Sequence, residues 1–258
     1  MTVRQTVLRL WPSARRVLGS PILWIALLLA ALVLLMPWLR PAFAWAFSGI
    51  EPPVYERESF LVLLFSQAAL VGASSLVSTV AGVGLAVFVT RPAGRDFRAI
   101  ANALAAIGQT FPPAAVLAIA VPMAGFGSLP TLIALILYGL LPIIENAIAG
   151  LEGVPRPVRE AAEGMGLSPL QVLRDIELPL AAPIIVAGIR TSVIINIGTA
   201  TIGSTVGAVT LGTPIINGLV AEKLPYVLQG AAVVGLFAIL TDMVFERLDR
   251  HLRPATER

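Results

Sequence analysis

The sequence predicts an all-α fold, a bundle of about six helices that cross a membrane. Of its 258 residues, 57% are hydrophobic and 13% are charged, and the mean hydropathy is +0.88. A soluble domain of this length needs far more charge to cover its surface. Several apolar stretches approach or exceed the roughly 20 residues that a helix needs to cross the hydrocarbon of a bilayer. The sequence lacks the alternating strands of about 10 residues that are typical of a transmembrane β-barrel.

The first half of the chain predicts three spans. The first covers residues 21–39 and is too long for the core of a signal peptide, although residues 42–44 resemble a small-residue cleavage site. Residues 40–59 read as an external loop. The second span, residues 60–90, is longer than the bilayer is thick, so it must tilt or project. Pro112 and Pro113 interrupt the third run, which predicts a kinked or two-piece crossing that ends near residues 125–127.

The second half predicts three more spans separated by one polar stretch. The fourth covers residues 129–151, and the polar residues 152–177 follow it. The fifth begins at Leu180 and gives way to a tract rich in glycine and threonine at residues 198–212. The sixth covers residues 227–245. We therefore divide the chain into an N-terminal segment (1–20), a transmembrane domain (21–247) that contains a loop at 152–179, and a tail (248–258).

The distribution of positive charge predicts the orientation. With both termini inside, cytoplasmic segments hold 14 of the 18 Lys and Arg residues, and the external loops hold only Arg40, Arg57 and Lys223. This bias follows the positive-inside rule and puts the 152–179 loop in the cytoplasm. The net charge of +3 does not indicate nucleic acid, because the basic residues border apolar runs. We expect a multi-pass protein of a bacterial inner membrane.

Several kinds of chemistry are not predicted for this chain. There is no cysteine, which excludes disulfides, iron–sulfur clusters and a cysteine nucleophile. The single histidine, His251, lies among the charges of the tail, where we expect a solvated side chain rather than a metal ligand. No pairing of a nucleophile with a base indicates an enzyme. No G-x-x-x-x-G-K-[ST] motif is present, so any nucleotide chemistry must come from a partner.

The sequence of the 152–179 loop predicts a first short helix with a defined end. Pro157 suits the first turn of a helix, and Glu160 favours its positive end. Gly166 suits the C-terminal cap, where a left-handed conformation is common. Four apolar residues at helical spacing form one face: Val158, Ala161, Ala162 and Met165.

A second short helix is predicted to follow. Ser168 caps it, Pro169 occupies its first position and Gln171 completes a capping box. We expect Pro179 to end this helix at the membrane. The result is two short helices bent at Gly166, exposed between two spans, which is more typical of a docking element than of a linker.

The same loop resembles the EAA loop of ABC importer permeases at every fixed position. The matching residues are Glu160, Ala161, Ala162, Gly166, Ile176, Leu178 and Pro179. The resemblance implies the type I ABC importer permease fold. It also implies that the loop sits in a cleft of a nucleotide-binding subunit and transmits its closure. Glu160 and Gly166 would be the acidic and hinge residues of the motif.

This resemblance further implies the partners. An ABC ATPase subunit would carry ATP and Mg, and we expect no cofactor in this chain. A second permease subunit, identical or related, would enclose the pathway and work by alternating access. We expect solute selection on a separate binding protein, because the chain ends soon after the last span.

Residues 187–219 look like the osmoprotectant permeases, which import glycine betaine, choline or related quaternary ammonium compounds. Residues 188–191 and 195–201 are the closest parts, and the resemblance covers roughly residues 60–245. One departure is residues 207–212, which are less rich in glycine than in that family. An aromatic cage for a quaternary ammonium group is not visible, since all four tryptophans precede Phe60.

Six polar residues within the spans are candidates for the translocation pathway or its gate: Gln67, Ser78, Arg190, Asn196, Thr199 and Thr201. Each has a structural alternative. Ser78 belongs to a small-xxx-small pattern that favours helix packing. Arg190 could reach the headgroups, or pair with Glu145 or Asp242.

Other transport functions stay open at this point. Amino-acid, phosphonate and oxyanion permeases share the loop motif. A secondary transporter or channel would leave the motif unexplained, and no inverted repeat is evident.

Overall fold

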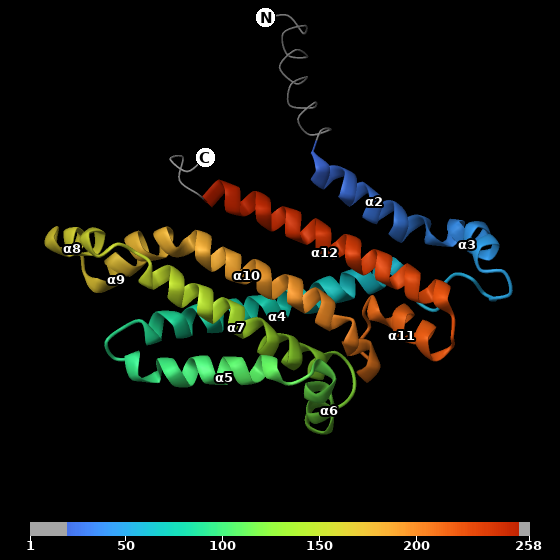
Figure 1. The fold of residues 1–258 in the computed structure, drawn as a ribbon, viewed down its shortest axis with the longest axis horizontal. Helices are drawn as coiled ribbons and strands as arrows, with labels where there is room; N and C mark the ends of the chain where they lie inside the picture. Colours follow the sequence, from blue (N-terminus) through green and yellow to red (C-terminus); the bar gives the residue numbers. More distant parts are fainter. Residues whose placement is uncertain (1–19, 253–258) are drawn as a thin grey trace, which may run out of the picture.

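The computed structural model describes residues 20–252, and these are largely helical. The long helices run roughly along the longest axis of the molecule, and several of the short ones lie at its two ends (Figure 1). The α-helices are α2 (Pro21–Leu35), α3 (Arg40–Ala46), α4 (Phe60–Val89), α5 (Arg98–Thr110), α6 (Pro113–Ala124), α7 (Ser128–Glu152), α8 (Arg156–Gly164), α9 (Pro169–Gln171), α10 (Leu178–Ala200), α11 (Gly212–Val220) and α12 (Leu224–Leu252). The 3-10 helices are η1 (Met36–Leu39), η2 (Arg95–Phe97) and η4 (Ile202–Val206), and η3 (Val172–Glu177) is a π-helical turn.

Five helical segments in residues 20–252 are long and apolar enough to cross a membrane. They are Pro21–Ala46, Phe60–Val89, Ser128–Glu152, Pro169–Ala200 and Leu224–Arg250. The third predicted span is divided into α5 and α6, and the backbone is extended at Phe111 and Pro112 between them. The predicted break is therefore confirmed. That this pair completes a sixth crossing stays a prediction.

The first span is longer than the sequence predicts. The hydropathy pattern starts an external loop at Arg40, whereas the structure continues helical to Ala46 through η1 and α3. Pro37 and Pro41 each stand in the first turn of one of these short helices. A proline is tolerated there because the N–H of that position has no partner within the helix.

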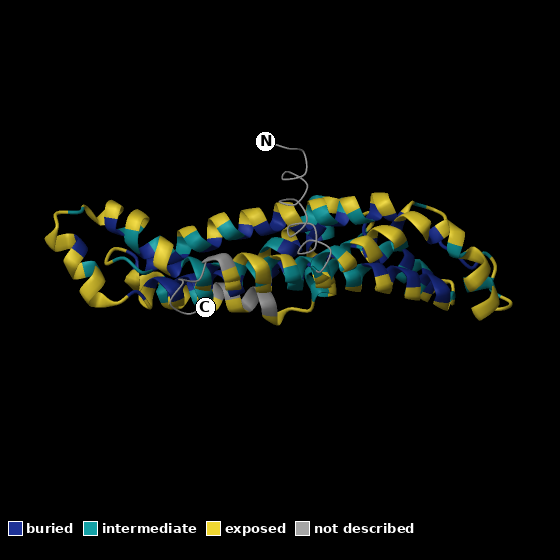
Figure 2. Ribbon diagram, turned by 90° about the horizontal axis from the view of Figure 1, so that it is seen from above, coloured by how far each residue is buried: buried dark blue, intermediate teal, exposed yellow. Residues whose placement is uncertain are grey.

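The core lies where α7 packs between α4 and α10. Small residues let these helices approach: a Cβ on Gly188 would lie 2.7 Å from the carbonyl oxygen of Pro142, and one on Gly139 would lie 2.6 Å from Ser192 Oγ. Small residues are enriched at such interfaces because association in a membrane depends on close packing. Figure 2 shows the buried residues inside the bundle and the exposed ones along its outer faces. Those outer faces are largely apolar, as expected beside lipid.

Candidate functional site

The first half of the 152–179 loop is α8 and a glycine-based end. The N–H of Gly166 donates to the carbonyl of Glu163 at 2.9 Å, and the N–H of Leu167 donates to that of Ala162 at 3.2 Å. Gly166 has a φ of +85°, which a residue with a Cβ adopts at a cost of about 1–2 kcal/mol. These two bonds form a Schellman motif, so the predicted cap is confirmed.

The second half begins with the predicted capping box. The N–H of Gln171 donates to Ser168 Oγ at 3.4 Å, and the N–H of Ser168 donates to Gln171 Oε1 at 2.8 Å. These bonds satisfy N–H groups at the start of the helix that have no partner within it. Both halves of the loop are thus held by contacts between near neighbours in the sequence.

The expectation that Pro179 ends this helix is wrong. Helix continues from Pro169 to Ala200, 32 residues in all, and Pro179 lies inside it. The π-helical turn η3 stands directly before the proline, and the N–H of Leu178 donates to the carbonyl of Leu173, five residues back. A proline lacks an N–H and clashes with the carbonyl four residues earlier. The wider turn accommodates both defects, so the chain stays helical.

The apolar side chains of the loop are largely uncovered. Met165 is 73% exposed, Leu170 is 72% exposed and Val158 is 39% exposed, whereas Ala162 is 1% exposed. The loop lies at one end of the bundle, where α8 and α9 project beyond the other helices (Figure 1). Exposed apolar residues gathered on one projecting element are typical of an interaction surface.

The motif residues lie along this loop and at the start of α10. The exposed ones are Glu160, Ala161, Gly166 and Pro179. The buried one is Ala162, and the half-buried ones are Ile176 and Leu178. A Cβ built on Gly166 meets no atom within 4 Å. The requirement for glycine within this chain is therefore the backbone conformation, not space.

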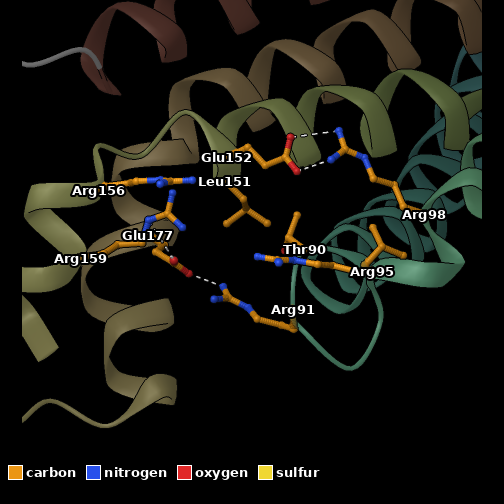
Figure 3. A pocket seen from close by; sticks show the side chains of 10 residues that line it. Thr90, Arg91, Arg95, Arg98, Leu151, Glu152, Arg156, Arg159 and Glu177 are labelled. Carbon is orange, nitrogen blue, oxygen red and sulfur yellow. Dashed lines mark hydrogen bonds and ion pairs between the residues drawn. The ribbon is translucent and has the colours of Figure 1, made fainter.

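One functional feature was missed by the sequence reasoning. Glu177 is 2% exposed and forms ion pairs with Arg91 and Arg159, the latter with 3.7 Å between Nε and Oε1. A buried carboxylate requires such partners. The pairs join η3 to α8 and to the turn after α4 (Figure 3). The sequence signal that could have revealed this feature is an acidic residue two positions before Pro179, at the edge of a span.

The polar residues predicted for the pathway lie inside the bundle. Gln67 is fully buried; its Nε2 donates to the carbonyl of Ile197 at 3.1 Å, and its Oε1 accepts from the N–H of Leu211 at 2.9 Å. Asn196 is also fully buried and donates from Nδ2 to Ser74 Oγ at 3.3 Å. Ser78 donates to the carbonyl of Ile136 at 3.0 Å. The structure therefore brings α4, α7 and α10 together through these side chains.

The remaining candidates bind locally or to α12. Arg190 donates from Nε and an η nitrogen to the two carboxylate oxygens of Asp242, at 2.6 and 2.7 Å. Of the two acidic partners considered, Asp242 is the one used. Thr199 and Thr201 donate to carbonyls of their own helix, at 2.9 and 2.7 Å. A pathway role for any of the six stays a prediction.

The family of inner-membrane components of binding-protein-dependent transport systems has a sequence profile that matches residues 78–254. The osmoprotectant import permease protein OsmY of Salmonella typhimurium is 36% identical over 95% of this chain and 98% of its own length. The choline transport system permease protein OpuBB of Bacillus subtilis is 43% identical over 57% of this chain and 68% of its own length.

Solved structures agree on the fold. The inward-facing MetNI methionine ABC transporter aligns with a TM-score of 0.66 over 75% of this chain and 96% of the other, at 22% identity. A second crystal form gives a TM-score of 0.67. At this identity the likeness supports the fold alone, which is the type I ABC importer permease fold that the sequence predicted. The chain is a multi-pass membrane protein that belongs to the family of binding-protein-dependent transport system inner-membrane components.

Proposed function

We propose that the chain is the translocation subunit of an ATP-driven importer for quaternary ammonium osmoprotectants such as glycine betaine or choline. The observation that carries this proposal is the match to OsmY, an osmoprotectant import permease protein, over nearly the whole of both chains. The similarity to OpuBB, a choline permease protein, supports the same class of solute. These relatives favour this class over the alternative solutes, which are amino acids, phosphonates and oxyanions.

The 152–179 loop is proposed to be the contact with a separate ABC ATPase subunit that binds ATP and Mg. Its exposed apolar side chains support this assignment, because they have no cover within the described chain. Its self-contained caps support it too, since a loop held by its own residues keeps its shape when it docks. The helix that continues from Pro169 to Ala200 can carry a rigid-body shift from the ATPase into the membrane.

The remaining assembly is proposed from the family. A second permease subunit, identical or related, encloses the pathway, and a separate solute-binding protein delivers the solute. The positive-inside rule supports cytoplasmic termini, and the family of inner-membrane components supports the bacterial inner membrane. Buried Gln67 and Asn196 hold α4 against α10, and we propose that they belong to the pathway or its gate together with the other four candidates.

The solute is tested by uptake into vesicles that contain the permease, its ATPase and its binding protein. We expect ATP-dependent uptake of labelled glycine betaine or choline, with no competition from an excess of amino acid or phosphonate. Uptake of one of those competitors, with none of quaternary ammonium compounds, would reject the proposed solute class while leaving the importer function in place.

The loop is tested by a pair of glycine variants. Gly166→Leu is expected to abolish transport while insertion stays normal, because φ = +85° becomes strained and the bend moves. Gly164→Leu is the matched control, since Gly164 ends α8 with open space around a Cβ and without a positive φ. Normal uptake with normally coupled ATP hydrolysis in Gly166→Leu would contradict the assignment.

A further inference from the structure

A pocket of about 290 Å³ lies at the end of the bundle that carries the 152–179 loop. We call it the arginine pocket, and ten residues line it: Val89, Thr90, Arg91, Arg95, Arg98, Leu151, Glu152, Arg156, Arg159 and Glu177. They come from the end of α4 and the turn after it, the start of α5, the end of α7, α8 and η3. Figure 3 shows five arginine side chains around this space.

The charge of the pocket is unbalanced. Five guanidinium groups face two carboxylates. Glu177 pairs with Arg91 and Arg159, and Glu152 pairs with Arg98. Within residues 20–252, Arg95 and Arg156 have no carboxylate partner. The lining therefore carries a net positive charge that the described chain does not neutralise.

Hydrogen-bonding capacity is also left over. Arg159 donates one η nitrogen to the carbonyl of Val154 at 2.8 Å, but its buried Nε has no hydrogen-bond partner among the described residues. A buried donor that has lost water and gained no hydrogen bond destabilises the folded chain, and the carboxylate of Glu177 at 3.7 Å compensates only in part. An oxyanion in the pocket would satisfy this donor and balance the unpaired guanidinium groups.

The position of the pocket indicates which kind of anion it would bind. Its apolar floor is Val89, the last residue of α4, and Leu151, next to the last residue of α7. Both helices are membrane spans by length and composition, so the pocket lies where the hydrocarbon ends. Phospholipid phosphates lie at this level. The planar fork of arginine matches phosphate oxygens in pairs.

We propose that the arginine pocket binds a phosphate group, either as the headgroup of an anionic phospholipid or as the free ion. Arg95 and Arg156 supply the charge, and Arg159 supplies its Nε, which lies 3.7 Å from Glu177 Oε1 and makes no hydrogen bond within the described chain. The bound phosphate links the turn after α4 to the first residue of α8. It therefore holds the 152–179 loop against the bundle next to the ion pairs of Glu177.

The test uses the full-length chain and a double variant, Arg95→Gln with Arg156→Gln. Neither change removes an ion pair of the described chain. Arg174→Gln is the control, because it removes one positive charge from the loop that holds Arg156, at a side chain that is 84% exposed and outside the pocket. Binding is measured by native mass spectrometry and thermal shift. The probes are inorganic phosphate, and nanodiscs of phosphatidylcholine with or without phosphatidylglycerol.

We expect the double variant to weaken binding by about tenfold or more for each guanidinium–phosphate contact that is lost, and Arg174→Gln to leave it unchanged. Binding of inorganic phosphate without lipid identifies the free ion; binding only with phosphatidylglycerol identifies the headgroup. Either result supports the site. The proposal is overturned if neither probe binds, or if Arg174→Gln weakens binding as much as the double variant. It is also overturned if the double variant binds both probes as tightly as the unchanged chain.

Discussion

The two ends of the bundle carry polar connections that are built in opposite ways. Residues 47–59 join α3 to α4 at one end, and the 152–179 loop joins α7 to α10 at the other. Both contain prolines and charged residues. They differ in the partners of their polar groups. One loop is bound to distant residues of its own chain, whereas the other is held locally and leaves an apolar surface exposed for another subunit.

The 47–59 loop is attached to residues far away in the sequence. The N–H of Tyr55 donates to Gln229 Oε1 at 2.9 Å, and Gln229 Nε2 donates to the carbonyl of Pro53 at 2.8 Å. The ring of Tyr55 packs edge-on against that of Tyr226, with 5.5 Å between centroids. Burial, and then a hydrogen bond to Glu58, raise the pKa of Tyr55 above its usual range, so its phenol stays protonated.

The 152–179 loop relies on its own residues instead. Its two caps are local, and its ion pairs to the rest of the described chain are those of Glu177 with Arg91 and of Glu152 with Arg98. Apolar side chains such as Met165 and Leu170 remain exposed. A loop that is rigid by itself and uncovered is suited to bind another subunit, whereas a loop bound to its own chain is not.

The largest expected loss of stability tests the attachment of the 47–59 loop. Gln229→Leu leaves the buried N–H of Tyr55 and the carbonyl of Pro53 without partners, at about 1–3 kcal/mol each. We expect the free energy of unfolding in detergent to fall by about 2–4 kcal/mol. Gln171→Leu, the matched change in the exposed capping box, should cost about 1 kcal/mol or less. Equal losses in the two variants would remove the contrast between the loops.

A smaller loss is expected at Glu177, the buried carboxylate of the 152–179 loop. Glu177→Gln leaves Arg91 and Arg159 without a carboxylate, but about a third of each arginine side chain is exposed, so water compensates. We expect about 1–2 kcal/mol, below the usual 3–5 kcal/mol for a fully buried pair. The control is Glu152→Gln, whose pair with Arg98 is exposed on both sides and should contribute less than about 1 kcal/mol.

Loss of a single cap should act only locally. Ser168→Ala removes the oxygen that accepts from Gln171, at about 1 kcal/mol. Amide hydrogen exchange should speed up in residues 169–177 and stay unchanged in α8. Ser59→Ala, which removes the cap of α4, should speed up exchange only in the first turn of that helix. Faster exchange throughout α8 would mean that the two halves of the loop are not independently held.

The smallest change in stability comes with the largest predicted change in assembly. Leu170→Ser should alter the free energy of unfolding of the permease by no more than about 0.5 kcal/mol, because the side chain is exposed. Co-purification with the ATPase should nevertheless decline. Undiminished recovery of the ATPase would argue against this apolar surface as the docking element.

Sequence patterns predicted the features that depend on near neighbours. The spans follow from apolar runs, and the caps at Gly166 and Ser168 follow from residues within a few positions of them. Apart from Asp242, which was one of two partners considered for Arg190, features that depend on distant contacts were not accessible. Glu177 meets a residue 86 positions away, and Gln67 meets residues 130 and 144 positions away. Pro179 was misjudged because a local rule for proline does not anticipate a wider turn that absorbs it.

The π-helical turn before Pro179 also sets an angle. Each residue of an α-helix advances the side chains by about 100°, and a π turn holds one residue more than an α turn. If the same residues of Val172–Glu177 formed an α-helical ladder instead, the extra residue would rotate α8 by about that angle around the axis of α10. Its caps and apolar side chains would be unchanged, yet they would face another direction. The π-helical turn thus sets the direction, around the axis of α10, in which the loop faces its partner.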